Sequence, residues 1–281
     1  MTLNAWVKGL LVVIGLAGIA CGLLGLWAIR LRARRQRREE AMSRPFPVAW
    51  HEVLTRNMGV YSVLPVDLRE ELQRNIHAFL AETPFEGCGG LTITDEIRVT
   101  IAAQACLLLL GRPNEGFPLL TSVLVYPDAY VAGGKSLLGG DTEEASVRLG
   151  ESWVRGVVVL SWNSVRRGAR NRHDGHNVAV HEFAHQLDQE DGAGDGAPPL
   201  QERAAYATWA SAFSEAFAEL HRDLDANRKT VIDAYGATNP AEFFAVATET
   251  FFEKPKQLAK RHPEVYDALQ GFYRVDPKMW G

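Results

Sequence analysis

The sequence predicts an α+β fold, mainly helical with a small sheet, preceded by one N-terminal transmembrane helix. Three observations support this prediction. Much of the chain has apolar residues at helical spacing, residues 119–126 and 156–162 are short apolar runs typical of strands, and residues 9–29 contain no charged side chain. With 281 residues, 47% of them hydrophobic, the chain can form one sizeable domain or at most two.

Charge and cysteine content exclude two broad classes of protein. The formal net charge is -4 at pH 7, so we expect no general binding of nucleic acid. The three cysteines, Cys21, Cys88 and Cys106, are too few and too scattered for a disulfide framework or a cysteine-rich zinc module.

The uncharged run at residues 9–29 has the length of a membrane span, because as a helix it would be about 32 Å long. The positive-inside rule places the C-terminal part of the chain in the cytoplasm. A cleaved signal peptide, or a lipoprotein signal ending at Cys21, fits less well because the apolar run continues past Cys21. Only Lys8 and the amino terminus are basic on the near side of the run, whereas arginines follow it directly at positions 30, 32, 34, 35, 37 and 38.

These features divide the chain into three parts. Residues 1–29 form an N-terminal segment with the transmembrane helix at about 9–29, residues 30–44 a basic juxtamembrane linker, and residues 45–281 the domain. Within the domain, the patterns predict helices at residues 67–80, 97–110, 177–187, about 200–222, 240–253 and 263–273.

Two strands, at residues 119–126 and 156–162, are predicted to form the small sheet. The Gly-rich residues 131–151 between them are typical of a loop or hairpin. The strand at residues 156–162 could offer an edge to an extended peptide or be an ordinary core strand, and the sequence leaves both open.

The segment with the clearest chemistry contains His181, Glu182 and His185 in an H-E-x-x-H pattern. Two histidines four residues apart lie one helical turn apart on the same face, so both imidazoles can reach one ion. Neutral imidazole nitrogen is a preferred ligand of Zn²⁺, and the intervening glutamate can reach a water on the metal. The alternative is a buried helix that carries these residues by chance, but burying them unpaired would be costly.

A catalytic zinc site needs a third protein ligand, and the sequence offers two sources. A local ligand would fall on Asp191, but that arrangement needs glycine at position 188, where Asp188 stands. The distant option is Glu242 or Glu249, which lie two turns apart on one face of a predicted helix. Either could bind the ion while the other orients an imidazole.

Three segments carry a family resemblance. HEFAHQLDQEDG at residues 181–192, DGAPPL at 195–200 and YGATNPAEFF at 235–244 resemble the Mlc titration factor A family of zinc peptidases. Residues 235–244 also resemble the catalytic domain of anthrax lethal factor. The resemblance covers roughly residues 45–281, the whole predicted domain.

This resemblance implies a zincin-like fold in which His181, His185 and Glu242 bind Zn²⁺, so it selects Glu242 over Glu249. Glu182 would be the general base that activates a zinc-bound water, and Tyr235 would stabilise the oxyanion. Family members are known as peptidases, aminopeptidase-like toward small substrates. The founding member also binds the glucose repressor Mlc.

We therefore expect a zinc-dependent peptidase, held by a single-pass anchor in the bacterial inner (cytoplasmic) membrane with its catalytic domain in the cytoplasm. Its expected partners are a peptide or protein substrate and the membrane, with no nucleic acid. The alternative is a regulatory protein that sequesters a transcriptional repressor, with peptidase activity secondary. The intact Glu182 favours the enzyme, because a purely structural zinc site has no need of a base.

Overall fold

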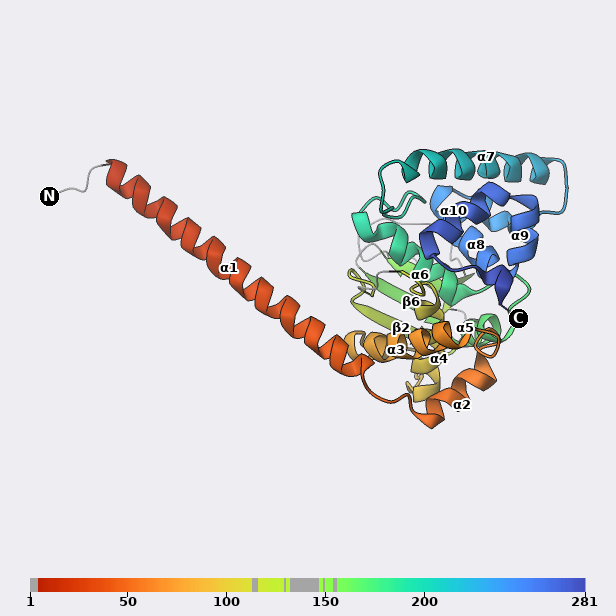
Figure 1. Ribbon diagram of the computed structural model, residues 1–281, viewed down its shortest axis with the longest axis horizontal. Coiled ribbons are helices and arrows are strands. Elements are labelled where there is room, and N and C mark those ends of the chain that lie inside the picture. Colours follow the sequence, from red (N-terminus) through yellow and green to blue (C-terminus); the bar gives the residue numbers. More distant parts are fainter. Residues whose placement is uncertain are drawn as a thin grey trace.

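The computed structural model describes residues 5–112, 116–128, 130–131, 147–148, 150–153 and 156–280. A long N-terminal helix extends away from a body in which helices surround a small sheet (Figure 1). The predicted α+β, mainly helical class is therefore confirmed. Most of the predicted loop or hairpin at residues 131–151 lies outside the described residues.

Helix α1 (Ala5–Met42) includes both the predicted membrane segment and most of the predicted linker. Residues 30–42 continue the helix because they are rich in Arg, Leu, Ala and Glu, which are strong helix formers, and Pro45 follows. The end of α1 packs against α3 (Val66–Glu82), where Arg38 Nη1 lies 2.9 Å from Oε2 of Glu82. Among the residues that the structure describes, no helix reaches the length and hydropathy needed to cross a membrane.

The sheet has four strands in the order β1-β2-β6-β5. Strands β1 (Phe85–Gly87), β2 (Ser122–Tyr126) and β6 (Val157–Ser161) are parallel, and β5 (Gly150–Trp153) is antiparallel to β6. The hypothesis that residues 156–162 offer a free edge is therefore wrong, because β6 pairs on both sides and β5 lies at that edge. The alternative, a core strand, is confirmed by the burial of Val158 and Leu160.

Several predicted helices match the structure closely. Predicted helix 67–80 corresponds to α3, and predicted helix 97–110 to α4, which begins after its N-cap Thr94 and is almost entirely buried. The structure contains α4 (Asp95–Leu107), α6 (Val178–Asp188), α7 (Ala205–Asp225), α8 (Pro240–Glu253) and α10 (Pro263–Tyr273).

The sequence patterns missed the shorter elements. Helix α5 (Trp162–Arg170) has nine residues and buries only Val165, Gly168 and Ala169, so it offers few apolar positions by which to recognise it. The other elements not predicted are α2 (Val48–Asn57), α9 (Pro255–Arg261), strands β1 and β5, and the 3-10 helices η1 (Gln189–Asp191), η2 (Ala234–Ala237) and η3 (Pro277–Met279). The antiparallel pair β3 (Tyr130–Val131) and β4 (Val147–Arg148) agrees with the hairpin predicted for residues 131–151.

The core lies between two groups of helices. In Figure 1, α2, α3 and α4 lie toward the bottom of the body, α5 lies to the right of the sheet, α7 to α10 lie above it, and α6 runs through the middle. Helix α6 packs against α4, α5 and α8 and against β5 and β6. Because helices and strands pack around α6 on several sides, the side chains of α6 are held in fixed positions.

Candidate metal centre

Helix α6 begins at a well-defined cap. The side chain of its N-cap residue Asn177 accepts a hydrogen bond from the backbone N–H of Val180 at 3.1 Å. Val180, Phe183 and Leu187 are fully or almost fully buried and form the apolar side of the helix. The helix therefore lies in one fixed rotation, which turns His181 and His185 together toward α8.

Helix α8 has its own cap at Asn239, whose side chain accepts a hydrogen bond from the backbone N–H of Glu242 at 3.0 Å. Pro240 occupies the first helical turn, where a missing N–H costs nothing. Phe243 and Phe244 are buried, so the start of α8 is held by the core. This arrangement directs Glu242 toward α6.

The loop after α6 also contacts the start of α8. Both carboxylate oxygens of Asp188 accept the backbone N–H of Gly196 at 2.9 Å, and burial raises the pKa of Asp188 to about 6 despite this hydrogen bonding. Gly196 has φ +84, and a Cβ there would lie 2.3 Å from the carbonyl oxygen of Pro240. Only glycine suits both the backbone conformation and the close contact.

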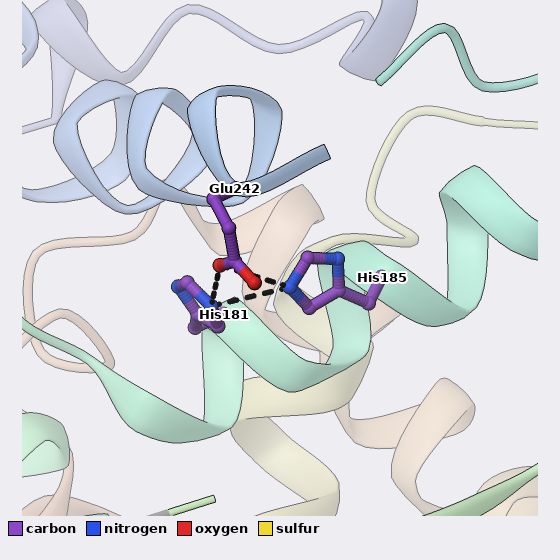
Figure 2. A group of neighbouring side chains, drawn as sticks. All are labelled: His181, His185 and Glu242. Atoms are coloured by element: carbon purple, nitrogen blue, oxygen red, sulfur yellow. Dashed lines mark hydrogen bonds and ion pairs between the residues drawn. The ribbon is translucent and has the colours of Figure 1, made fainter. Parts of the chain in front are cut away.

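His181, His185 and Glu242 meet at one point, as Figure 2 shows. The Nε2 atom of His181 lies 3.0 Å from Oε2 of Glu242, and Nε2 of His185 lies 3.4 Å from the same oxygen. The two Nε2 atoms are 3.2 Å apart. One ligand atom from each of the three residues thus lies within 4.8 Å of the others.

The arrangement of these atoms fits a divalent cation. Nδ1 of His181 faces the carboxylate of Glu249 at 2.8 Å, so in the neutral imidazole Nδ1 holds the ring hydrogen and Nε2 carries the lone pair. That lone pair points at a carboxylate oxygen and a second imidazole nitrogen, which would repel it unless a positive charge lies between them. A proton can satisfy one such contact, whereas one cation can satisfy all three. Imidazole nitrogen and carboxylate oxygen are also ligands that zinc accepts.

The pKa shifts of His181 and Glu242 in the metal-free site also indicate that positive charge is favoured there. Burial alone would lower the pKa of His181, but hydrogen bonds to Glu242 and Glu249 raise it well above its ordinary value. Burial alone would raise the pKa of Glu242, but hydrogen bonds to His181 and His185 lower it strongly. The site therefore favours ionised Glu242 beside positive charge.

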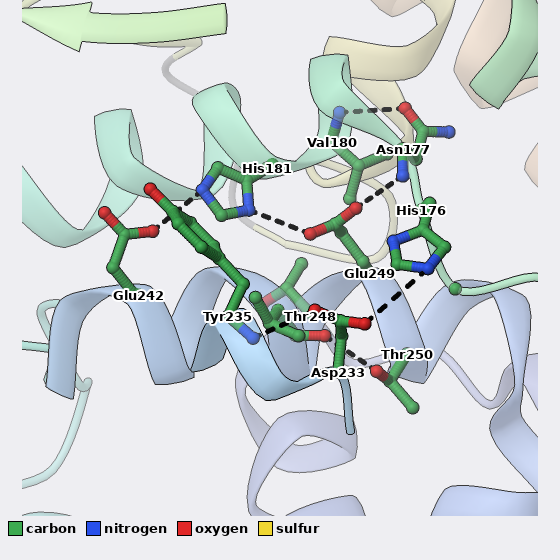
Figure 3. Close-up of polar contacts among 12 residues, drawn as sticks. His176, Asn177, Val180, His181, Asp233, Tyr235, Glu242, Thr248, Glu249 and Thr250 are labelled. Atoms are coloured by element: carbon green, nitrogen blue, oxygen red, sulfur yellow. Dashed lines mark hydrogen bonds and ion pairs between the residues drawn. The ribbon is translucent and has the colours of Figure 1, made fainter. Parts of the chain in front are cut away.

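The other two predicted site residues lie beside this cluster. Glu182 follows His181 on α6 and is only 5% exposed. Tyr235 is 55% exposed and lies on η2, where its ring centroid is 5.8 Å from that of His181. The side chain of Asp233 caps η2 by accepting the backbone N–H of Tyr235 at 2.9 Å, and Figure 3 shows Tyr235 directed toward His181 and Glu242. All five predicted site residues therefore gather in one region.

The two alternatives for a third ligand lie elsewhere. Asp191 is exposed, and its carboxylate accepts the backbone N–H of Ala193 at 2.9 Å. Glu249 contacts the far side of the His181 ring, at Nδ1. Nε2 of the exposed His176 lies 3.7 Å from the carboxylate of Asp233.

Sequence reasoning missed Glu253, one turn after Glu249 on α8. Glu253 is buried, and its carboxylate accepts the backbone N–H of Gly175 at 2.9 Å and the side-chain amide of Asn177 at 3.1 Å. The signal that could have identified it is a further glutamate four residues after Glu249, on the same face of a mainly apolar helix.

Comparisons with known proteins identify the family of this chain. The profile described as glucose-regulated metallo-peptidase M90 matches residues 31–274. The uncharacterized protein slr2042 of Synechocystis sp. is 43% identical over 246 residues, which cover 86% of this chain and 89% of that protein. Mlc titration factor A of Yersinia pestis (strain Pestoides F) is 30% identical over 240 residues, covering 82% and 87%. Mlc titration factor A of Yersinia pseudotuberculosis serotype O:1b gives the same values. This chain therefore belongs to the glucose-regulated metallopeptidase family M90, the family of the Mlc titration factor A proteins.

Proposed function

We propose that this protein is a zinc-dependent peptidase with a zincin-like catalytic domain. One observation carries the proposal: Nε2 of His181, Nε2 of His185 and a carboxylate oxygen of Glu242 converge at one point, with the Tyr235 ring beside His181 and with Glu182 next to His181 on α6. Membership of a metallopeptidase family supports it independently.

In this proposal His181, His185 and Glu242 hold the zinc ion. When bound, zinc would act as a Lewis acid that acidifies water and polarises a peptide carbonyl. The three residues come from two rigid helices, α6 and α8, which pack directly against each other. A site built on packed helices keeps its geometry while substrates enter and leave.

Glu182 and Tyr235 would carry the proton transfers and the charge stabilisation. Glu182 takes a proton from the attacking water and later delivers it to the leaving amine, as a general base and then a general acid. The Tyr235 hydroxyl donates a hydrogen bond to the carbonyl oxygen as negative charge develops on it. Tyr235 is half exposed, which suits a group that must meet a substrate from solution.

The variant Glu182→Gln tests this proposal, because it removes the base and leaves all three proposed ligands. We expect the purified variant to bind zinc as the parent does and to hydrolyse peptides at least ~100-fold more slowly. The exposed Glu202→Gln serves as a matched control and should behave like the parent. Equal hydrolysis by Glu182→Gln and the parent would refute the assigned base. A parent that binds no zinc would refute the site.

We also propose aminopeptidase-like specificity, which rests on the family resemblance. A peptide with a free amino terminus should be cleaved and the same peptide with an acetylated amino terminus should not. Equal cleavage of both would show that the enzyme does not read the amino terminus.

The names of the relatives support a second candidate function. Two relatives with 30% identity are named Mlc titration factor A, so we propose that this chain could also bind a transcriptional repressor. The inactive Glu182→Gln variant separates the two functions. It should retain binding to a purified repressor of the Mlc type in a titration if binding is independent of hydrolysis, and no binding by either form would end this proposal.

We further propose that residues 9–29 anchor the protein in the inner membrane with the domain in the cytoplasm. The support is the uncharged sequence followed by six arginines, together with the exposure of Leu26, Trp27 and Ile29 on the part of α1 that extends from the body (Figure 1). The full chain should remain in the membrane fraction after a high-salt wash, and a chain lacking residues 1–29 should not. Recovery of the full chain in the soluble fraction would contradict the anchor.

A further inference from the structure

The His181 imidazole lies between two carboxylates, one at each ring nitrogen. Nε2 faces Glu242 at 3.0 Å and Nδ1 faces Oε1 of Glu249 at 2.8 Å (Figure 3). Glu249 is only 6% exposed. Of the two carboxylates, Glu242 also approaches His185, at 3.4 Å from its Nε2 atom, so Glu242 and Glu249 have different roles.

The contact at Nδ1 decides which nitrogen of His181 can bind a metal. A neutral imidazole carries its hydrogen on one nitrogen and a lone pair on the other. A carboxylate at Nδ1 accepts that hydrogen and therefore keeps the lone pair on Nε2, toward His185 and Glu242. It also fixes the rotation of the ring and makes the imidazole a stronger ligand.

Glu249 also holds the beginning of α6. Its second oxygen, Oε2, accepts the backbone N–H of Asn177, the residue that caps α6. One carboxylate therefore ties a histidine side chain to the start of the helix that carries it. Glu249 itself is held firmly, since its neighbours Val246, Thr250 and Phe252 on α8 are all buried.

We propose that Glu249 is a positioning residue that holds the His181 ring in the tautomer and orientation needed for metal binding. This inference rests on the proposed zinc site, but it concerns a residue that does not bind the ion. Removing Glu249 should weaken zinc binding while His181, His185 and Glu242 all remain.

Glu253 provides a matched control for this role. It is a buried glutamate on α8, one helical turn after Glu249. Its carboxyl group accepts hydrogen bonds from the backbone N–H of Gly175 and from the side-chain amide of Asn177, so it also holds the segment at the start of α6. Its two carboxyl oxygens accept from Gly175 and Asn177 rather than from His181. If Glu249 acted only by holding the segment before α6, substituting either glutamate would weaken zinc binding. If Glu249 orients the His181 ring, only its own substitution would change that orientation.

The experiment measures the zinc dissociation constant of the full chain by competition with a chromogenic chelator. We expect Glu249→Ala to weaken zinc binding ~10–100-fold, as is usual when the carboxylate partner of a metal-bound histidine is removed. Glu249→Gln should fall between the parent and Glu249→Ala, because its one amide oxygen cannot accept from both Nδ1 of His181 and the backbone N–H of Asn177, and its NH₂ group would face one of these two donors. Glu253→Gln should stay within about threefold of the parent.

A second measurement separates ring orientation from overall stability. Co²⁺ in place of zinc should give an altered visible absorption spectrum in Glu249→Gln and the parental spectrum in Glu253→Gln, with unfolding followed in parallel for both. If Glu249→Ala does not fold, Glu249→Gln alone decides the question. Parental zinc affinity and a parental Co²⁺ spectrum in Glu249→Gln would overturn the proposal, as would an equal loss in both variants. A parent that binds no zinc would instead refute the proposed function.

Discussion

The carboxylate of Glu242 lies 3.0 Å from Nε2 of His181, although the two residues are 61 positions apart in the chain. The contact exists because α6 and α8 pack side by side, each starting from its own asparagine cap. A site assembled from two helices in this way depends on every ligand and on the packing that holds them.

Replacing Glu242 should therefore weaken zinc binding and remove the stabilisation that zinc adds to the fold. With zinc at about 100 times its dissociation constant, the parent gains ~2.7 kcal/mol in its free energy of unfolding, which a chelator removes. Glu242→Ala should bind zinc at least ~100-fold more weakly and gain little from the same zinc concentration. Thermal unfolding with zinc and with chelator measures both effects. Equal zinc-dependent stabilisation in parent and variant would show that Glu242 does not bind the ion.

Removing the Tyr235 hydroxyl should slow catalysis without disturbing the fold. Tyr235 is 55% exposed, so Tyr235→Phe should change the free energy of unfolding by less than about 0.5 kcal/mol. If the hydroxyl stabilises the oxyanion, kcat should fall ~10²–10³-fold with little change in KM. Steady-state kinetics on one peptide measure this. An unchanged kcat would remove Tyr235 from the mechanism.

Substitution of Gly196 should destabilise the contact between the loop after α6 and the start of α8. Gly196→Ala meets both a positive φ and the carbonyl oxygen of Pro240, so we expect a loss of roughly 2–4 kcal/mol. Gly192→Ala is the control, because Gly192 has φ +86 but nothing lies within 4 Å of its added Cβ. It should lose only about 1–2 kcal/mol. Denaturant unfolding compares them, and equal losses would mean that the Pro240 contact is unimportant.

The buried Glu253 predicts a stability that depends on pH. Burial, reinforced by the nearby charge of Glu249, raises the pKa of Glu253 to about 9, although Asn177 and Gly175 donate hydrogen bonds to it. Between pH values near the ordinary pKa of 4.5 and about 9, Glu253 in the folded protein keeps a proton that the unfolded chain releases. The free energy of unfolding therefore decreases as the pH rises through this range.

Glu253→Gln should remove that dependence, because its amide is neutral at every pH. The free energy of unfolding of the variant, relative to the parent, should rise by up to about 1.4 kcal/mol for each pH unit between about 5 and 9. Denaturant unfolding at pH 5, 7 and 8.5 with the same zinc concentration checks this. A constant difference across the series would show that Glu253 does not titrate in this range.

Local patterns predicted most of the helices because each is long enough to show its apolar period and its cap. The predicted ranges 240–253 and 263–273 coincide with α8 and α10, each of which begins at a proline. Helix α5 was missed because its side chains are mainly polar, and β1 because it has only three residues. Local patterns also do not show which strands pair with each other. The position of β6 between β2 and β5 was therefore known only from the complete sheet.

By itself the sequence determined the fold class through local patterns and the family through matching motifs, and it placed His181 and His185 one turn apart on a single helix. It left Glu242 and Glu249 equivalent by spacing, two turns apart on one helical face. Only the docking of α8 against α6 decided their positions, with Glu242 at Nε2 of His181 and Glu249 at Nδ1. The physical reason is that helical periodicity sets which residues share a face, whereas contacts between two faces depend on how the whole core packs around them.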